Sequence, residues 1–358
     1  MKLLLFCFFA IQLTFSQTLL PVYQGEIKPK FELVWEISDS DEFMLSEPRK
    51  LTLDKDGNLY FAEYGDCIIR KFDKDGKFIK SIGRKGEGPG EFKNCRSIDF
   101  DKNGNYYIYD VFLRRVNIFN SNDEFVKSIK SSNIINELYI DESGQVVLHY
   151  DKNSPKGDYV YGKHFSAVVD EEFKVVKNLD SLEIKEMKIS KSGKNVSVMG
   201  IVYGPRYNLL PLKNGNAFVT NSEYYVVKIF SPSGELLSSK TIGKKREPVR
   251  EKDKEKVKAR YNDGGFVRQD MLEFNTLKPF YSSIFQDRDG FILAQKYTVD
   301  NEEEIKYDVF SPEGKFLNEV FLPYKYFSGQ NVITDKFIIV NEETEDELPV
   351  IRKYKIVF

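Results

Sequence analysis

The chain repeats one short phrase: an apolar run, a tight turn of the form Asp-x-x-Gly-Asn, and a second apolar run. Residues Leu51–Glu63 return in this pattern as Ile98–Asp110, and a following segment, Arg70–Phe78, returns as Asn117–Phe125. A unit this small cannot bury both faces of its own strands, so the copies must pack on one another. The repeat therefore predicts an architecture of short β-strands in which each unit is stabilised by its neighbours.

Aligning the copies on the turn glycine predicts the number of units. The sixth copy, Thr334–Asn341, lacks the glycine; the other five turns contain Gly57, Gly104, Gly144, Gly215 and Gly290, which stand 47, 40, 71 and 75 residues apart. Six four-stranded units around an axis predict an all-β fold, a six-bladed β-propeller of four-stranded antiparallel blades. The strand expected at residues 31–37 precedes the first copy and is predicted to complete the last blade and close the ring.

The two long intervals between copies indicate insertions in loops. Lys244 to Arg260 carries nine basic and four acidic residues, and the insertion at about residues 244–280 is predicted to contain a short helix. This basic segment is either a solvated helix or a surface that docks a partner. Residues 150–162 are polar and contain Gly and Pro, which predicts a mobile loop.

The first 16 residues have the layout of a Sec signal peptide, with one Lys, a short apolar run and a small residue, Ser16, before the expected cleavage site. Residues 17–30 are predicted to be an N-terminal linker and residues 31–358 the propeller domain. No segment approaches the roughly 20 apolar residues of a membrane-spanning helix, and a net charge of -2 favours no nucleic-acid partner. We therefore expect a secreted or periplasmic monomer with no membrane span.

One stretch carries a family resemblance. Residues 82–92 read Ile-Gly-Arg-Lys-Gly-Glu-Gly-Pro-Gly-Glu-Phe, and this phrase resembles the NHL-type six-bladed β-propellers, especially secreted ones of Bacteroidetes-like bacteria. The resemblance covers roughly residues 31–358 and is clearest in the first two blades. The NHL pattern has an acidic residue at the end of the second strand and an Arg four residues before the Phe; Asp110 and Arg115 match it, whereas blade one has Glu63 and Ile68.

Strand register predicts which polar residues surround the mouth of the central channel, because first strands begin and second strands end on the same face. Convergent polar groups in a concavity are the default hypothesis for a binding site. The predicted mouth residues are Arg49, Glu63, Arg96, Asp110, Tyr207, Asn221, Tyr281, Lys296 and Asn341.

Two interpretations of the arginines stay open. Arg49 and Arg96 share one register in adjacent blades and are suited to hold a carboxylate or sulfate group. Alternatively, Arg49 pairs with Glu63 and Arg96 with Asp110, which would neutralise buried charge without a ligand.

A metal site is a further alternative. Related propellers of the gluconolactonase and regucalcin group hold a divalent cation in the channel. By that resemblance the oxygens of Glu63, Asp110, Asn221 and Asn341 are candidate Ca²⁺ ligands.

The sequence offers little support for other chemistry. His149 and His164 are the only two histidines of the chain, too few for a zinc site of several His ligands. His149 is interpreted as a structural histidine near the mouth or, alternatively, as a lone general base. Cys67 and Cys95 lie in loops of neighbouring blades on one face, and in an exported chain they are candidates for a disulfide.

The leading functional hypothesis is a non-catalytic module that binds a small anionic or sugar ligand, or a protein, through the channel-mouth face. A divalent-metal-dependent hydrolase or lyase, with its site in the channel, is the alternative. The fold alone cannot decide between them, because propellers host many activities.

Overall fold

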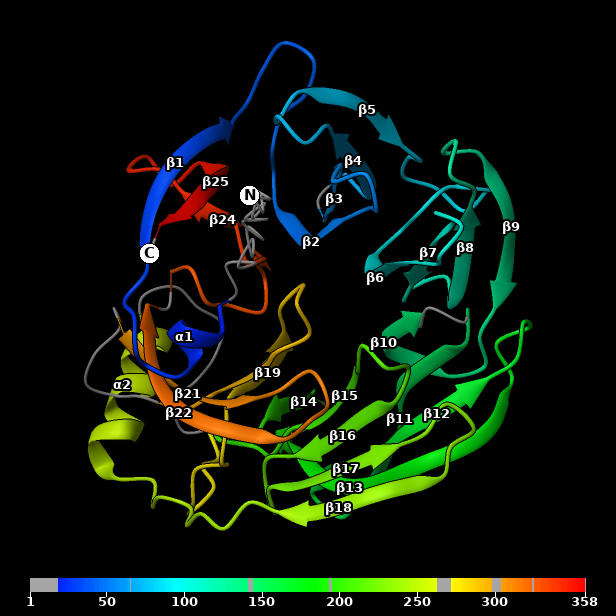
Figure 1. The fold of residues 1–358 in the computed structure, drawn as a ribbon. Helices are drawn as coiled ribbons and strands as arrows, with labels where there is room; N and C mark the ends of the chain where they lie inside the picture. Colours follow the sequence, from blue (N-terminus) through cyan, green and yellow to red (C-terminus); the bar gives the residue numbers. More distant parts are fainter. Residues whose placement is uncertain are drawn as a thin grey trace, which may run out of the picture.

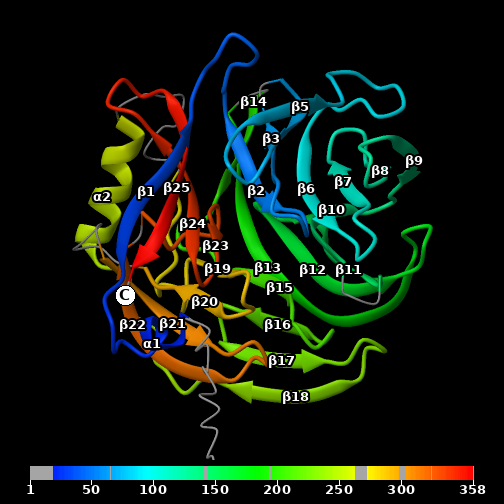
Figure 2. The same cartoon turned by 45° about the horizontal axis from the view of Figure 1, so that its top comes forward.

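The computed structural model describes residues 19–64, 66–140, 144–192, 195–262, 272–297, 304–323 and 325–357. In these residues the strands form six antiparallel sheets arranged around a central axis (Figures 1 and 2). The predicted six-bladed β-propeller is therefore confirmed.

The first three blades follow one another along the chain. Blade one contains β2 (Pro48–Leu53), β3 (Leu59–Glu63), β4 (Ile68–Phe72) and β5 (Phe78–Ile82). Blade two contains β6 (Cys95–Phe100), β7 (Tyr106–Asp110), β8 (Arg115–Phe119) and β9 (Phe125–Lys130). Blade three contains β10 (Ile134–Ile140), β11 (Val146–Lys156), β12 (Tyr159–Val169), β13 (Val175–Ser192) and β14 (Asn195–Gly200).

The last three blades include the one that closes the ring. Blade four contains β15 (Tyr207–Pro211), β16 (Ala217–Asn221), β17 (Val226–Phe230) and β18 (Leu236–Thr241). Blade five contains β19 (Ser283–Gln286), β20 (Ile292–Gln295), β21 (Glu304–Phe310) and β22 (Phe316–Pro323). Blade six combines β23 (Val332–Ile333), β24 (Phe337–Glu343) and β25 (Pro349–Val357) with β1 (Lys30–Ile37). Because β1 pairs antiparallel with β25, the predicted closure by the N-terminal strand is confirmed.

Blade three departs from the repeat. Its β11 and β12 pair without interruption from Val146 opposite Val169 to Lys156 opposite Tyr159. The prediction of a mobile loop at residues 150–162 was therefore wrong: the segment is a long β-hairpin. Its polar residues satisfy the cross-strand ladder, which needs backbone amides and carbonyls and not apolar side chains.

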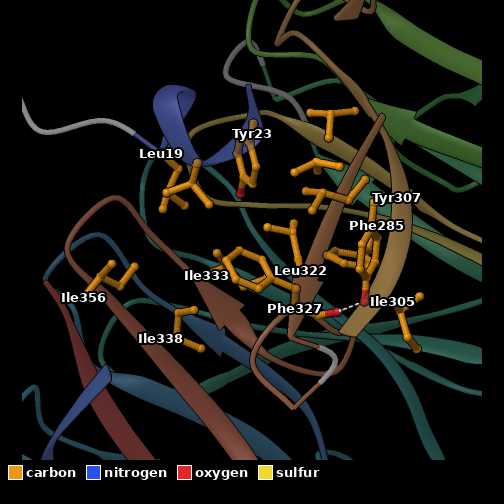
Figure 3. Close-up of a cluster of buried hydrophobic side chains, with 14 of the residues drawn as sticks. Leu19, Tyr23, Phe285, Ile305, Tyr307, Leu322, Phe327, Ile333, Ile338 and Ile356 are labelled. Carbon is orange, nitrogen blue, oxygen red and sulfur yellow. Dashed lines mark hydrogen bonds between the residues drawn. The ribbon is translucent and has the colours of Figure 1, made fainter. Parts of the chain in front are cut away.

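The segment predicted as a linker contains a short helix, α1 (Leu20–Tyr23), that packs into the core between blades five and six. Figure 3 shows Leu19 and Tyr23 among apolar side chains that include Phe285 and Phe327. The hydroxyl of Tyr23 donates a hydrogen bond of 2.6 Å to Asp287. Residues 19–23 are therefore part of the folded domain.

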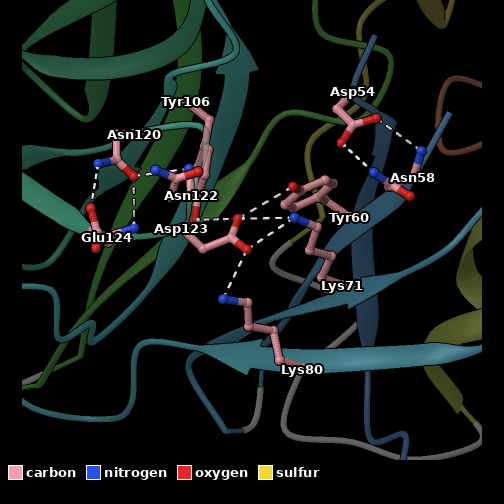
Figure 4. Close-up of polar contacts among 10 residues, drawn as sticks. All are labelled: Asp54, Asn58, Tyr60, Lys71, Lys80, Tyr106, Asn120, Asn122, Asp123 and Glu124. Atoms are coloured by element: carbon pink, nitrogen blue, oxygen red, sulfur yellow. Dashed lines mark hydrogen bonds and ion pairs between the residues drawn. The ribbon is translucent and has the colours of Figure 1, made fainter. Parts of the chain in front are cut away.

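The repeated turns have a common physical cause. Gly57 and Gly104 adopt φ values of +84° and +81°, a left-handed conformation that glycine enters without a steric penalty. The turn between β4 and β5 likewise has Gly76 at φ +83°, and its counterpart between β8 and β9 is Asp123, at φ 65°. Its carboxylate reaches blade one and pairs with Lys71 at 2.9 Å and Lys80 at 3.0 Å (Figure 4). The departure from glycine therefore supplies an ion pair between two blades.

The basic insertion contains α2 (Glu251–Asn262), as the sequence predicts. On the surface of α2, Lys254 pairs with Glu251 at 3.0 Å. Lys258 also approaches Glu251, at 3.9 Å. In the part of the chain that the structure describes, no helix is long and apolar enough to span a lipid bilayer.

Candidate functional site

Glu63, at the end of β3, holds the chain that enters blade one. It is fully buried, and its Oε2 accepts hydrogen bonds from Ser46 N (3.1 Å), Ser46 Oγ (2.9 Å) and Glu47 N (3.0 Å). Its Oε1 atom is buried without a hydrogen-bond partner. Three hydrogen bonds to Oε2 therefore link Glu63 to residues 46–47, which lead into blade one.

Asp110 holds the corresponding segment of blade two. Its Oδ2 accepts the amides of Lys93 (2.6 Å) and Asn94 (3.2 Å). Its Oδ1 accepts the amides of Phe112 (3.0 Å) and Leu113 (2.9 Å). Asp110 therefore accepts four amide hydrogens and links residues 93–94, which precede blade two, to residues 112–113, which follow β7. This is a structural explanation for an acidic residue at the end of the second strand.

Arg115, the other residue that matches the NHL pattern, holds the Gly-rich connection. Its guanidinium donates to the carbonyls of Glu87 (2.8 Å), Gly88 (2.7 Å) and Glu91 (2.8 Å). The side chain of Glu91 accepts the amide of Gly88 at 2.7 Å. These hydrogen bonds therefore hold the Gly-rich segment in place as the connection between blades one and two.

The two arginines of the predicted ring do not pair with these acids. Arg49 forms an ion pair with Glu47 and lies over the ring of Tyr64, 4.2 Å from its centroid. Arg96 makes no ion pair or side-chain hydrogen bond to any residue in the described ranges. The prediction that each Arg neutralises its own blade's acid was wrong, because backbone amides already solvate both carboxylates.

The remaining predicted residues contact groups of their own blade or of the neighbouring blade. Asn221 accepts the amide of Tyr224 at 2.8 Å, and Asn341 donates to the carbonyl of Pro48 at 2.8 Å. The contacts of the other three are Tyr207 Oη to Ser166 Oγ (3.0 Å), Tyr281 Oη to Asn208 Oδ1 (3.2 Å) and Lys296 Nζ to Asp308 Oδ2 (2.7 Å). Of the nine predicted mouth residues, Lys296 alone lines either of the cavities described below.

The four candidate Ca²⁺ ligands do not fit a cation in this arrangement. Asp110 would have to give up amide donors to coordinate a metal, and Asn221 already accepts an amide. Glu63 keeps one oxygen, Oε1, without a hydrogen-bond partner, and a single free oxygen does not make a Ca²⁺ site. Among the described residues, no cluster of three or more His, Cys, Asp or Glu side chains is placed to hold a metal ion. The metal-dependent alternative stays a prediction for which these contacts provide no support.

Cys67 and Cys95 are free thiols, so the predicted disulfide is not formed. The Cys67 thiol instead donates to the carbonyl of Lys93 at 2.8 Å. Burial raises the pKa of both thiols, that of Cys95 most strongly. Both are therefore poor nucleophiles at neutral pH.

The structure brings together both histidines, which the sequence analysis treated separately. Nε2 of His149 lies 3.0 Å from Nδ1 of His164, and Nε2 of His164 lies 2.7 Å from Oε1 of Glu186. An ionised Glu186 accepts from His164 Nε2, which leaves His164 Nδ1 to accept from His149 Nε2. Burial, His164 and Arg96 lower the pKa of His149 to about 3, which makes it a weak base at neutral pH. The long hairpin creates this cluster, and the repeat pattern carries no signal for it.

A cavity of about 700 Å³ lies on the central axis, and the innermost strand of every blade lines it. Its lining includes Lys213, Arg288 and Gly290, which belong to the turns between first and second strands. The cavity therefore reaches the turn face, opposite the predicted mouth face.

Most charges along this cavity are compensated. Lys50 and Glu137 form an ion pair at 3.0 Å. Asp99 accepts the amides of Phe100 (2.9 Å) and Ile140 (2.8 Å), and burial raises its pKa to about 6. Burial likewise raises the pKa of Asp287 to about 7. The cavity is thus polar but carries little uncompensated negative charge.

Several polar groups of the cavity have no partner. Within the described residues, Thr52, Tyr139 and Gln330 make no side-chain hydrogen bond, and Lys213 and Arg288 make no ion pair. These groups can donate to or accept from a bound molecule without breaking a contact of the fold.

Comparisons with known proteins agree with this architecture. Residues 39–122 match the model of a family described as a 6-bladed beta-propeller. The chain is a six-bladed β-propeller. No curated protein matches its sequence.

Solved structures resemble this propeller over nearly its whole length. A crystal structure of a Bacteroides fragilis protein, named as exported, has 12% identity and a TM-score of 0.58, covering 93% of this chain and 98% of its own. A DUF4221-family protein of Bacteroides vulgatus has 10% identity and a TM-score of 0.47, covering 92% of this chain and 99% of its own. Virginiamycin B lyase from Staphylococcus aureus has 10% identity and a TM-score of 0.44, with coverages of 92% and 100%. At 12% identity the likeness to the Bacteroides fragilis protein concerns the propeller fold alone, and function must be argued from the propeller's own sites.

Proposed function

We propose that the protein is an extracytoplasmic binding module whose central channel holds a small polyhydroxylated ligand such as a sugar. The observation that carries the proposal is the axial cavity of about 700 Å³, which lies within the 300–1,000 Å³ typical of ligand pockets. The signal-peptide layout of residues 1–16 supports export.

The chemistry of the walls supports a ligand rich in hydroxyl groups. Thr52, Tyr139 and Gln330 offer hydroxyl and amide groups that the fold does not use. A sugar hydroxyl both donates and accepts hydrogen bonds, so it can satisfy such groups without bringing a charge into the channel. Lys213 and Arg288, near the turn face, favour a ligand that also carries a carboxylate.

The predicted mouth ring contributes differently from our first expectation. Its carboxylates hold the blade connections and so keep the channel in one shape. A rigid, preformed cavity loses less entropy when a ligand binds.

Calorimetric titration of residues 17–358 with neutral sugars and sugar acids tests the proposal. Ligand at about 100 times its Kd should stabilise the protein by about 2.7 kcal/mol in a thermal-shift assay. Thr52→Trp, which fills the channel, should abolish binding. Thr241→Trp, on the exposed end of β18, is the matched control and should leave binding unchanged. If every sugar fails to bind the folded protein, or if binding survives in Thr52→Trp, the ligand is not in the channel.

A further inference from the structure

A second cavity, of about 410 Å³, lies on the mouth face between the basic insertion and blade five. Its lining is strongly basic: eight of its residues are Lys or Arg and three are Glu. Three further carboxylates stand behind the walls and pair with lining cations: Asp308 with Lys244, Asp253 with Lys278 and Glu223 with Arg246. Glu304 is paired outside this set, with Lys28 at 3.1 Å, so the lining cations outnumber the carboxylates that face them among the described residues.

A buried ion network holds part of this wall in place. Asp308 is fully buried and accepts from Lys244 at 2.5 Å, from Lys296 at 2.7 Å and from the hydroxyl of Tyr225. Lys244 also donates to Glu319 (2.5 Å), and Lys296 also donates to the carbonyl of Phe280 (2.9 Å). An ammonium group has three donors, so each of these lysines keeps one for a ligand. Their positions are set before any ligand arrives, which lowers the entropic cost of binding.

Two cations at the cavity lack such partners. Lys245 and Arg250 line the cavity, are exposed, and form no ion pair with any described residue. An Arg guanidinium and a Lys ammonium that are free of carboxylates are suited to the oxygens of a phosphate group. An excess of cations favours a group that carries about two negative charges, as a phosphate monoester does near neutral pH.

Aromatic rings line the same cavity. Phe280, Tyr297 and Phe321 contribute to it, and Phe321 is 58% exposed. Lys306 lies over that ring, 5.5 Å from its centroid. A flat ring on the ligand can stack on such a surface while its charged group reaches the cations.

We propose that this mouth-face cavity binds a small-molecule phosphate monoester whose organic part is a ring, either aromatic or sugar. The phosphate is held by Lys245, Arg250 and the remaining donors of Lys244 and Lys296. The ring packs on Phe280 and Phe321. This site is separate from the channel, and its occupancy does not depend on a ligand there.

Calorimetric titration of residues 17–358 at low salt tests this site. The probes are 4-nitrophenyl phosphate, glucose 6-phosphate, glycerol phosphate and inorganic phosphate, with 4-nitrophenyl sulfate as the monoanionic comparison. The two ring phosphates should bind at least about tenfold more tightly than glycerol phosphate and inorganic phosphate, since ring stacking is lost in the latter. The sulfate ester should bind more weakly than its phosphate counterpart because it carries less charge. Which ring phosphate binds more tightly distinguishes an aromatic from a sugar ligand.

Variants separate a built site from general charge attraction. Lys245→Gln and Arg250→Gln should each weaken 4-nitrophenyl phosphate binding about tenfold, the loss of one charge-assisted hydrogen bond. Both side chains are exposed, so circular dichroism should show unchanged folding. Lys254→Gln is the control: it removes the same charge from α2, but Lys254 pairs with Glu251 and does not line the cavity. An equal loss in Lys254→Gln, no binding of ring phosphates by the folded protein, or equal binding of inorganic phosphate would overturn the proposal. Loss of sugar binding in Thr52→Trp with ring phosphate binding retained would show that the two sites are distinct.

Discussion

Replacement of Asp110 by Ala tests whether this carboxylate holds the blade connections or serves a ligand. Asp110 is fully buried and accepts four backbone amides, those of Lys93, Asn94, Phe112 and Leu113. The Ala variant leaves these donors without an acceptor, at about 1 kcal/mol or more for each one. We expect the free energy of unfolding to fall by about 4 kcal/mol, a large part of the roughly 5–15 kcal/mol typical of a folded protein.

Two further variants sharpen this measurement. Asp110→Asn keeps one carbonyl oxygen but directs an amide against two amide donors, so it should cost about half as much, roughly 2 kcal/mol. Arg96→Ala is the control, because Arg96 is exposed and has no side-chain partner among the described residues; its effect should stay within about 0.5 kcal/mol. The free energies come from urea unfolding followed by circular dichroism at pH 7.

The opposite pattern would refute the reasoning. If Asp110→Ala changed the free energy of unfolding by less than about 1 kcal/mol, the amides would have to be satisfied in another way. If the variant also lost a Ca²⁺-dependent stabilisation present in the parent protein, the metal-ligand interpretation would replace the structural one.

Three other predictions concern the N-terminal helix, the channel and the thiols. Tyr23→Phe removes the 2.6 Å hydrogen bond to Asp287 and should lower the free energy of unfolding by about 2 kcal/mol at pH 8. At pH 5 the loss should be smaller, because the Asp287 carboxyl is then neutral. An equal loss at both pH values would contradict an ionised acceptor. Burial raises the pKa of Asp287 from its ordinary value of 3.8 to about 7. Between these values the native state binds more protons than the unfolded state, so stability falls as pH rises through this window. Asp287→Asn should flatten that fall, as measured by urea midpoints from pH 4 to 8, and an unchanged slope would assign the effect to another group. In urea without reductant, two thiols per chain, Cys67 and Cys95, should react with Ellman's reagent in residues 17–358; none would react if they formed a disulfide.

The blade architecture could be predicted from the sequence because its signals are local. Short apolar runs that end in an acidic residue, Leu59–Glu63 and Tyr106–Asp110, with a turn glycine at a set distance before them, are enough to indicate a hairpin. A hairpin that cannot bury its own faces must stack, and six copies close a ring. The closing strand was predicted from another apolar run, residues 31–37, and the helix of the insertion from the charge pattern of Lys244 to Arg260.

The roles of the polar residues could not be predicted in this way. Register correctly placed Glu63 and Asp110 at the ends of β3 and β7. It could not show that backbone amides of the preceding connections would donate hydrogen bonds to these carboxylates in place of a ligand. Those connections are irregular, and their backbone conformation has no period in the sequence. A carboxylate that closes a strand therefore looks the same whether it faces a ligand or a loop.

Tertiary structure alone created the features on which the functional proposals rest. The pairing of β11 with β12 brings His149 next to His164, although the sequence there was interpreted as a loop. The mouth-face cavity joins an insertion to a blade that lies beyond it in the chain, and the axial cavity takes residues from all six blades. Periodicity determines which face of a strand each side chain occupies. Which side chains meet across blades depends on loop conformation and on packing between segments that are distant in the sequence. The residues of a single repeat do not determine either of these.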